Sequence, residues 1–509
     1  MESTLHRPAH QGTSRAPPAT VRMAFDNSYA RDLEGLYVPW KPAGSSAPRL
    51  LQFNRALADE LGLDSNEMIS ASGLAVLAGN AVPALAQPLA QAYAGHQFGG
   101  FSPQLGDGRA LLLGELIDRQ GRRRDVALKG SGRTPFSRRG DGLSALGPVL
   151  REYLMGEAMH ALGIPTTRAL AAVATGGTVQ REQTQPGGIL TRVAASHLRV
   201  GTFEFFAARN DEALLRRLAD YAIARHDAAL IDAPDRYLGL LQAVIERQAS
   251  LIARWMGVGF IHGVMNTDNM AISGETLDYG PCAFMEHFDP AAVFSSIDTE
   301  GRYAYGQQPV IAQWNLARLA EALLPLIDTD AATAARRAGE VVQGFAKRFD
   351  VHWTAVLGAK LGLAGSAADD RALADDYLTL LQQHRIDFTL GFARLTDAAA
   401  GNDAPLRALF GAADAALEPW LIRWRARAEA DTNSAQRLAA MRQANPIYIP
   451  RNHKVEEALA AAVEHDDLAP FERLLRVLEH PFDERAADSA FAEPAPLEQT
   501  ACYRTFCGT

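Results

Sequence analysis

Cysteine is scarce in this 509-residue chain, and its three copies, Cys282, Cys502 and Cys507, exclude a disulfide scaffold or a cysteine-rich zinc module. No apolar run approaches the roughly 18–20 residues that a helix needs to cross a bilayer, so we expect no membrane partner. The first twenty-two residues hold Arg, Ser and Pro without an apolar stretch. They predict a disordered tail rather than a secretory signal, with a weak transit peptide as the alternative. We therefore expect a cytoplasmic protein if the source is bacterial, and a mitochondrial one if it is eukaryotic.

Positive charge is also in deficit, because the chain carries a net charge of −9. This balance argues against bulk nucleic-acid binding. Residues 101–200 differ from the rest, since they contain fourteen Lys or Arg and eight Asp or Glu, a balance of +6. A hairpin turn would account for Arg122, Arg123 and Arg124, and the segment stays positive without them. A locally basic segment in an acidic chain indicates a small polyanionic ligand.

The order of secondary-structure patterns predicts the fold class. Strand-like runs come first, at 110–117, 125–129, 169–175 and 189–195, with turns at 118–124 and 185–188 and a helix over 144–162. Helical patterns follow at 210–231, 237–257, 310–327, 330–361 and 370–399. Strands followed by helices predict an α+β, kinase-like two-lobe fold, with a β-rich small lobe, an α-rich large lobe and a mostly helical C-terminal extension. The expected boundaries are an N-terminal extension over 1–92, the small lobe over 93–206, the large lobe over 207–400 and the extension over 401–509.

Four motifs occur in the order in which a kinase-like fold uses them to hold Mg²⁺ and a nucleoside triphosphate. They are the turn Gly106-Asp-Gly-Arg109, the strand lysine Lys129, the loop Asn266-Thr-Asp-Asn269 and the turn Asp278-Tyr-Gly280. A protein kinase reads His-Arg-Asp-x-x-x-x-Asn, but here Val264 stands at the position of the catalytic aspartate. A chain that keeps the metal ligands and lacks this base is either inactive or performs different chemistry with ATP.

The downstream motifs contain the candidate metal ligands and a candidate base. The Asp278 carboxylate and the Asn269 amide oxygen are hard ligands that suit Mg²⁺, although Asn269 is also a natural turn former. Asp268 is the only carboxylate between His262 and Glu275 in the sequence. It is therefore the best candidate to accept a proton from an incoming hydroxyl, with a structural turn as the open alternative.

The upstream motifs supply candidate cations. Glu152 lies on the flank of the apolar face of the predicted helix, where a carboxylate needs a cationic partner. Lys129 is the expected partner, and Arg151 or solvent is the alternative.

Arginines suited to forked phosphate contacts are numerous around these motifs. They are Arg133, Arg138, Arg139, Arg192 and Arg199. Any one of them could instead pair with a surface carboxylate. Acting as a set, they would hold the γ-phosphate inward and leave the α-phosphate open to attack, with pyrophosphate as the leaving group.

Long blocks of the chain resemble the selenoprotein O family. The blocks are residues 93–109, residues 128–137, His262-Gly-Val-Met-Asn-Thr-Asp-Asn269, Asp278-Tyr-Gly-Pro-Cys-Ala-Phe-Met285, Asn445-Pro-Ile-Tyr-Ile-Pro-Arg-Asn452 and Tyr503-Arg-Thr-Phe-Cys-Gly-Thr509. The resemblance implies a kinase-like pseudokinase that binds ATP in a flipped orientation. It would transfer AMP to Ser, Thr or Tyr hydroxyls of proteins, and we expect it to act as a monomer with no nucleic-acid partner.

The resemblance also implies roles for individual residues. The ATP contacts would be Gly106, Gly108, Arg109, Lys129, Asp141, Gly142, Arg192 and Arg199. Asn269 and Asp278 would hold Mg²⁺ or Mn²⁺, Asp268 would accept the proton, and Glu152 would be the helix partner of Lys129. Uridylyl transfer from UTP, an atypical kinase and a non-catalytic nucleotide-binding scaffold stay open as alternatives.

A redox role follows from the resemblance as well. Eukaryotic relatives carry selenocysteine near the C-terminus, where this chain has Cys507. In bacterial relatives the resemblance implies pairing of that cysteine with the one after the Asp-Tyr-Gly turn, here Cys282. Cys502 is a competing partner, so the pairing stays open.

Overall fold

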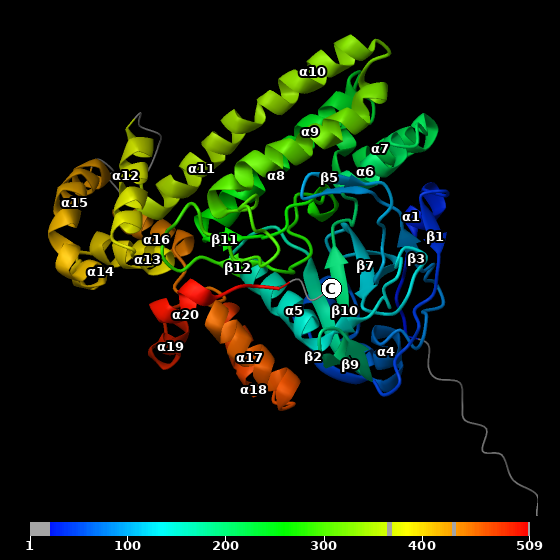
Figure 1. The fold of residues 1–509 in the computed structure, drawn as a ribbon, viewed down its shortest axis with the longest axis horizontal. Helices are drawn as coiled ribbons and strands as arrows, with labels where there is room; N and C mark the ends of the chain where they lie inside the picture. The colour runs from blue at the N-terminus through cyan, green and yellow to red at the C-terminus, as the bar shows by residue number, and fades with distance from the viewer. Residues whose placement is uncertain (1–20, 364–368, 430–433, 507–509) are drawn as a thin grey trace, which may run out of the picture.

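The structure is a computed structural model that describes residues 21–363, 369–429 and 434–506. An antiparallel sheet with short helices gathers on one side, and the long helices gather on the other (Figure 1). The sheet has the strand order β1 (Tyr37–Pro39), β3 (Leu89–Gln91), β6 (Ala110–Ile117), β7 (Arg123–Lys129), β10 (Thr184–Ala194), β9 (Arg168–Gln180) and β2 (Arg49–Phe53), and β8 (Ser144–Ala145) pairs with β10. Two small ladders join β4 (Gly95–Gln97) to β5 (Gly100–Ser102) and β11 (Phe260–Ile261) to β12 (Ala283–Phe284).

All four predicted strands are present, but one of the predicted turns is misplaced. The predicted runs correspond to β6, β7, β9 and β10. The turn expected at 185–188 lies inside β10, and the chain reverses at residues 181–183 instead. A register shift between Pro186 and Gly188 accommodates these residues, because a bulge tolerates proline and glycine within a strand. The short apolar run at 270–272 does not form a strand, since Ala271 makes only an isolated bridge to Arg199.

Helix α5 (Leu146–Ala161) covers one face of the sheet against β9 and β10. It is the helix expected at 144–162, but Ser144 does not cap it, because Ser144 belongs to β8 and pairs with Gly188. Apolar side chains such as Leu150 and Leu154 are fully buried. Glu152 is buried with them, so this helix carries a carboxylate into the interior beneath the sheet.

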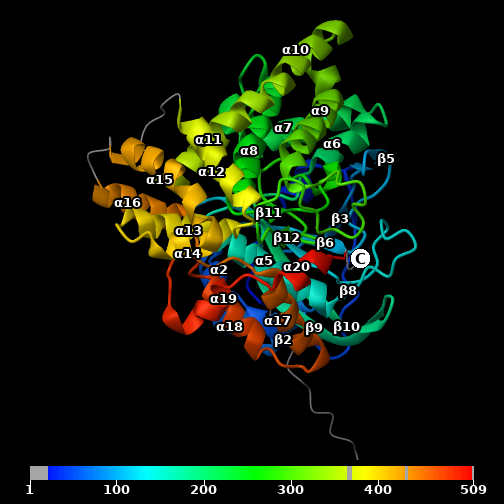
Figure 2. The same ribbon diagram turned by 60° about the vertical axis from the view of Figure 1, so that its left-hand side comes forward.

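Some of the remaining helices flank the sheet, and the others form the opposite side of the molecule and its C-terminal part (Figures 1 and 2). Those before and beside the sheet are α1 (Ser28–Asp32), α2 (Arg55–Glu60), α3 (Ser65–Met68), α4 (Ala71–Leu77), α6 (Val200–Ala207) and α7 (Glu212–His226). The long ones are α8 (Arg236–Gly257), α9 (Gln308–Ile327), α10 (Ala331–Gln343), α11 (Phe345–Leu361), α12 (Asp370–Gln383) and α13 (Phe388–Ala399). The C-terminal ones are α14 (Ala404–Phe410), α15 (Asp414–Glu429), α16 (Ser434–Ala444), α17 (Asn452–Glu464), α18 (Ala469–Leu478), α19 (Ser489–Ala492) and α20 (Leu497–Cys502). The single helix expected at 330–361 is divided at Gly344, and the one expected at 370–399 is divided at 384–387.

One helix within the described residues, Tyr305–Ile327, is long and apolar enough by length and composition to cross a membrane. The sequence shows no unbroken apolar run there, because polar residues such as Gln313, Asn315 and Arg318 interrupt the apolar ones. The helix also carries buried polar side chains, which hold the chain that leads into the site described below. Gln308 donates to the Phe260 carbonyl at 3.0 Å, and Asn315 donates to the Met265 carbonyl at 2.9 Å. Since α9 packs against α6, α8 and α10, it serves as a core helix of this fold.

Candidate functional site

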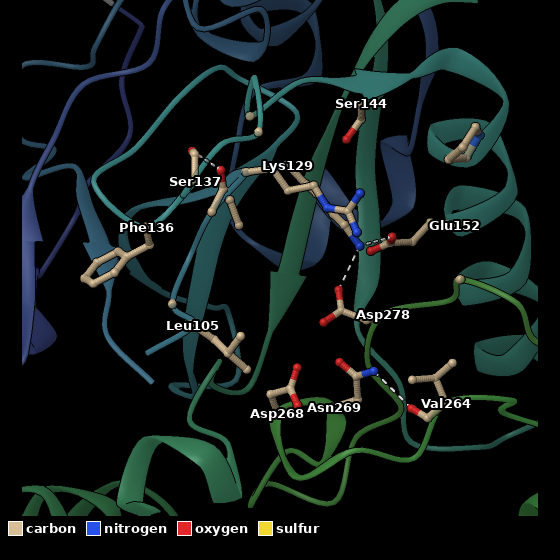
Figure 3. A pocket seen from close by; sticks show the side chains of 18 of the residues that line it. Leu105, Lys129, Phe136, Ser137, Ser144, Glu152, Val264, Asp268, Asn269 and Asp278 are labelled. Carbon is tan, nitrogen blue, oxygen red and sulfur yellow. Dashed lines mark hydrogen bonds and ion pairs between the residues drawn. The ribbon is translucent and has the colours of Figure 1, made fainter. Parts of the chain in front are cut away.

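A cavity of about 500 Å³ lies where the sheet meets the loops that follow α8 (Figure 3). Its lining includes all twelve residues to which the sequence assigned nucleotide, metal, base or supporting roles. They are Gly106, Gly108, Arg109, Lys129, Asp141, Gly142, Glu152, Arg192, Arg199, Asp268, Asn269 and Asp278. The fold therefore brings together residues that are up to about 170 positions apart in the chain.

Three cations converge on the Asp278 carboxylate in the interior of this cavity. Lys129 Nζ and Arg192 Nη1 lie 2.7 and 2.6 Å from Oδ1, and Arg199 Nη1 lies 2.7 Å from Oδ2. Burial opposes ionisation, but the three cations outweigh it and hold the pKa of Asp278 well below its usual range. Asp278 also has a φ of 61°, a left-handed conformation that these contacts help to maintain.

The expected ion pair between Lys129 and Glu152 is present. Glu152 also lies 3.2 Å from Arg192 Nη1, so it shares two of the three cations with Asp278. Arg151, the alternative partner, instead donates to the Cys282 carbonyl at 2.6 Å and pairs with Glu456. Five charged groups thus form one buried cluster that carries one more positive than negative charge.

Two glycines allow the loops to close around this cluster. Gly142 has a φ of +71°, and a Cβ there would lie 2.2 Å from the Gly132 carbonyl oxygen. Gly106 has a φ of +96°, and its Cβ would lie 2.5 Å from the Phe136 ring. Any other residue at these positions would combine backbone strain with a steric clash.

A 3-10 turn at Thr267–Asn269 presents the other two polar groups. Asn269 donates its amide Nδ2 to the Val264 carbonyl at 3.0 Å, which turns its oxygen toward Asp278 (Figure 3). Asp268 is buried, and burial raises its pKa to about 6. Its Oδ2 accepts from Gln97 at 3.2 Å, whereas Oδ1 has no hydrogen-bond partner among the described residues.

The oxygen atoms of Asn269 and Asp278 are ligands of the kind that a hard divalent cation prefers. Asn269 and Asp278 offer one amide oxygen and one carboxylate. The described residues contain no cluster of three His, Cys, Asp or Glu side chains that could hold a metal by themselves. Mg²⁺ commonly uses one or two carboxylates and completes its shell with water and phosphate oxygens, so these residues suit an ion that arrives with a nucleotide.

The structure adds pocket residues that the sequence patterns missed. Arg181, from the turn between β9 and β10, grips Asp141 through two contacts of 2.9 and 3.2 Å. Tyr93 places its ring 4.7 Å from the Arg199 guanidinium, and its phenol is buried. Neither residue belongs to a motif with a recognisable spacing, so only their contacts in the folded protein reveal that they lie at the cavity. In contrast, Arg133 and Arg139 are absent from the lining, and Arg138 is the member of that loop trio that reaches it.

The structure also shows the surroundings of His262, which precedes the 266–269 loop, and of the candidate redox cysteine Cys282. His262 is buried with a lowered pKa and places Nε2 2.9 Å from the Leu277 carbonyl, as expected of a packing residue. Cys282 is a free, buried thiol, and burial raises its pKa to about 11. Cys507 lies outside the described residues. The tail approaches the same region, because Thr505 donates to the carbonyl of Pro281 at 2.7 Å.

A buried cationic cluster, a pair of metal-suited oxygens and an adjacent carboxylate define an enzyme that acts on nucleotides. Comparison with known proteins identifies the class, because residues 20–479 match the family model for the protein adenylyltransferase SelO. The chain belongs to this family, and it is a nucleotidyltransferase.

Curated relatives carry the name protein nucleotidyltransferase YdiU. One from Cereibacter sphaeroides is 63% identical over 486 residues, covering 95% of this chain and 99% of the relative. One from Chromobacterium violaceum is 58% identical over 475 residues, covering 93% and 99%. One from Rhizobium rhizogenes is 56% identical over 512 residues and covers all of both chains.

Neutralising Asp278 tests the charge balance of the cluster. We expect Asp278→Asn to lower the melting temperature by at least about 2 °C without ligand, because three buried cations lose their shared carboxylate. Inorganic triphosphate without metal should then raise the melting temperature of the variant more than that of the wild type. Thermal unfolding with and without triphosphate measures both effects, and the exposed Asp232→Asn provides the control. Equal responses of the variant and the wild type to triphosphate would contradict this account.

Proposed function

We propose that the protein transfers AMP from ATP to Ser, Thr or Tyr hydroxyls of other proteins and releases pyrophosphate. The observation that carries the proposal is the position of Arg192 and Arg199, whose side chains are only 2% and 3% exposed. Together with Lys129 they make the interior end of the cavity cationic, which favours a triphosphate that points inward. The α-phosphate would then lie nearer the opening and the acceptor. We place this site between the two lobes of a kinase-like fold.

Asp268 is the residue that we assign to proton transfer. Its Oδ1 is unpaired and buried, and its pKa near 6 leaves it ionised at neutral pH. The acceptor hydroxyl would give its proton to this carboxylate while its oxygen bonds to the α-phosphorus. The bond from that phosphorus to the bridging oxygen breaks, and pyrophosphate leaves with the bonding electrons.

We assign the remaining residues by the charge of their side chains or by their place in the cavity lining. Asn269 and Asp278 would hold Mg²⁺ or Mn²⁺, which when bound offsets negative charge on the phosphates. Arg109, Asp141 and the glycines Gly106, Gly108 and Gly142 would border the nucleotide, because they line the cavity beside the cations. We further infer that the enzyme works as a cytoplasmic monomer. Protein substrates are supported by the name protein nucleotidyltransferase, which its bacterial relatives carry.

Isotope position separates AMP transfer from phosphorylation. With ATP labelled at the α-phosphate, we expect label on an acceptor protein, and with ATP labelled at the γ-phosphate we expect none. α-Labelled UTP in a parallel reaction compares uridylyl transfer under the same conditions. Protein-bound γ-label would overturn the inward orientation of the triphosphate, and nucleotide binding without any transfer would favour a scaffold.

Removal of the proposed base should affect the chemical step more than nucleotide binding. We expect Asp268→Asn to lower kcat by roughly 10²- to 10⁴-fold, since Asn cannot accept the proton. The Kd for ATP should change by less than about threefold, measured by calorimetry. Asp298→Asn alters another buried carboxylate outside the cavity lining and serves as the control. Full activity of Asp268→Asn would remove Asp268 from the mechanism.

We also propose that oxidation of Cys282 and a C-terminal cysteine restrains the loop that carries Asp278. The motivation is that Cys282 lies four residues after Asp278 and that the tail contacts Pro281. Mass-spectrometric mapping with and without reductant should find Cys282 joined to Cys507 in the oxidised protein. A Cys282–Cys502 bond would reassign the partner, and a thiol that is free under both conditions would reject the proposal.

A further inference from the structure

A buried histidine holds Arg192 from the side that faces away from the cavity. Arg192 donates its Nε hydrogen to His197 Nε2 at 3.1 Å, and both side chains are almost completely buried. A guanidinium offers only N–H donors, so the His197 Nε2 atom in this contact carries no proton. His197 is therefore neutral, with its proton on Nδ1.

Asp125 fixes that tautomer. His197 Nδ1 lies 3.0 Å from Asp125 Oδ2, which also accepts from the His197 backbone N–H at 2.8 Å. Burial opposes ionisation of Asp125, but Arg225 and His197 outweigh it and hold its pKa at about 2. Burial also lowers the pKa of His197. The hydrogen bond to Asp125 opposes this shift, whereas Arg192 and Arg199 act in the same direction as burial. The pair thus consists of an ionised aspartate and a neutral histidine.

The sheet and one helix position this pair in advance. Asp125 stands on β7 opposite Ala194 of β10, two residues beyond Arg192, and His197 follows β10 directly. Arg225 reaches Asp125 from α7 and also donates to the Ala195 carbonyl. Arg225 is thus the cation that pairs with Asp125, although it also lies 3.5 Å from Glu115. The ion pairs of Arg192 are with Glu152 and Asp278 instead.

We propose that His197 is a positioning residue that orients Arg192 without neutralising it. On the cavity side, Arg192 Nη1 contacts Asp278 and Glu152, which are both acidic. If a metal ion engages Asp278, Arg192 shares that partner, whereas the contact with His197 is unaffected. A carboxylate in place of His197 would cancel the guanidinium charge, but a neutral imidazole leaves it for the triphosphate. This inference rests on the proposed function, because it explains how the site for the terminal phosphates is built.

The test compares ligands that differ in their terminal phosphates. We expect His197→Leu to raise the Kd for Mg·ATP by about tenfold or more, because a charged donor loses its acceptor and Arg192 loses its orientation. The Kd for AMP should stay within about twofold. His197→Gln should keep the Kd for ATP within about threefold, since its amide can accept from Arg192 and donate to Asp125. His226→Leu is the control, because His226 is a partly buried histidine of this region that bonds Ser196 instead of Arg192.

Nitrogen chemical shifts of the histidine rings test the tautomer in the unaltered protein. We expect the His197 signal, assigned by its loss in His197→Gln, to report a proton on Nδ1 and none on Nε2 at pH 7, with and without ATP. A proton on Nε2, or on both nitrogens, would overturn the proposal even if His197→Leu does not fold.

The binding data can overturn it independently. Equal weakening of ATP and AMP by His197→Leu, or the same selective loss in His226→Leu, would reduce His197 to a structural residue. Transfer of γ-label by the wild type would refute the proposed AMP transfer. A selective loss of ATP affinity in His197→Leu would still support the positioning role in that case, so the two failures are distinguishable.

Discussion

The contact on which the site depends is the buried carboxylate of Asp278 surrounded by Lys129, Arg192 and Arg199. Charges of one sign cannot be assembled out of water without partners, because desolvation costs several kcal/mol per ion. Asp278 and Glu152 supply those partners and leave the cluster with an excess of one positive charge. A triphosphate accompanied by a divalent cation brings charges of both signs to this cluster. The same contacts that stabilise the ligand-free protein would thus prepare the site that we propose for the triphosphate.

The surrounding elements can be understood as supports for this cluster. The ladder between β7 and β10 places Lys129 and Arg192 on neighbouring strands, and α5 delivers Glu152 from below. The β4–β5 hairpin fixes the opposite wall, since the backbone of His96 donates to Thr267 and Gln97 donates to Asp268. Helix α9 holds the segment that precedes Thr267 in place, because Asn315 donates to the Met265 carbonyl. Precision at the site therefore derives from rigid elements on both sides of the cavity.

Two of the carboxylates that line the cavity, Asp278 and Asp268, differ in pKa because their surroundings differ. Asp278 has three cationic neighbours and a depressed pKa, whereas Asp268 is buried with one amide donor and has a raised pKa. Divergent pKa values in one cavity suit divergent roles, one as a permanently charged ligand and the other as a proton acceptor. Neighbouring arginines are likewise kept distinct, since Arg192 is held by a neutral histidine and Arg199 lies against the Tyr93 ring.

Motif order and residue chemistry in the sequence were sufficient to predict the strands around Lys129, the helix that carries Glu152 and candidate residues such as Asp278 and Asp268. The family resemblance supplied others, such as Asp141 and Gly142, and all twelve candidates are among the residues that line the cavity. These features are local patterns, or chemical types at characteristic spacings, and the chain displays them directly. The register shift at Pro186, the grip of Arg181 on Asp141 and the chain of contacts from Arg225 through Asp125 and His197 to Arg192 depended on tertiary structure alone. The register shift depends on how β9 and β10 pair, and the other contacts join side chains that are far apart in the sequence. Burial, which no spacing reveals, decides the partners and the protonation states of Asp125 and His197.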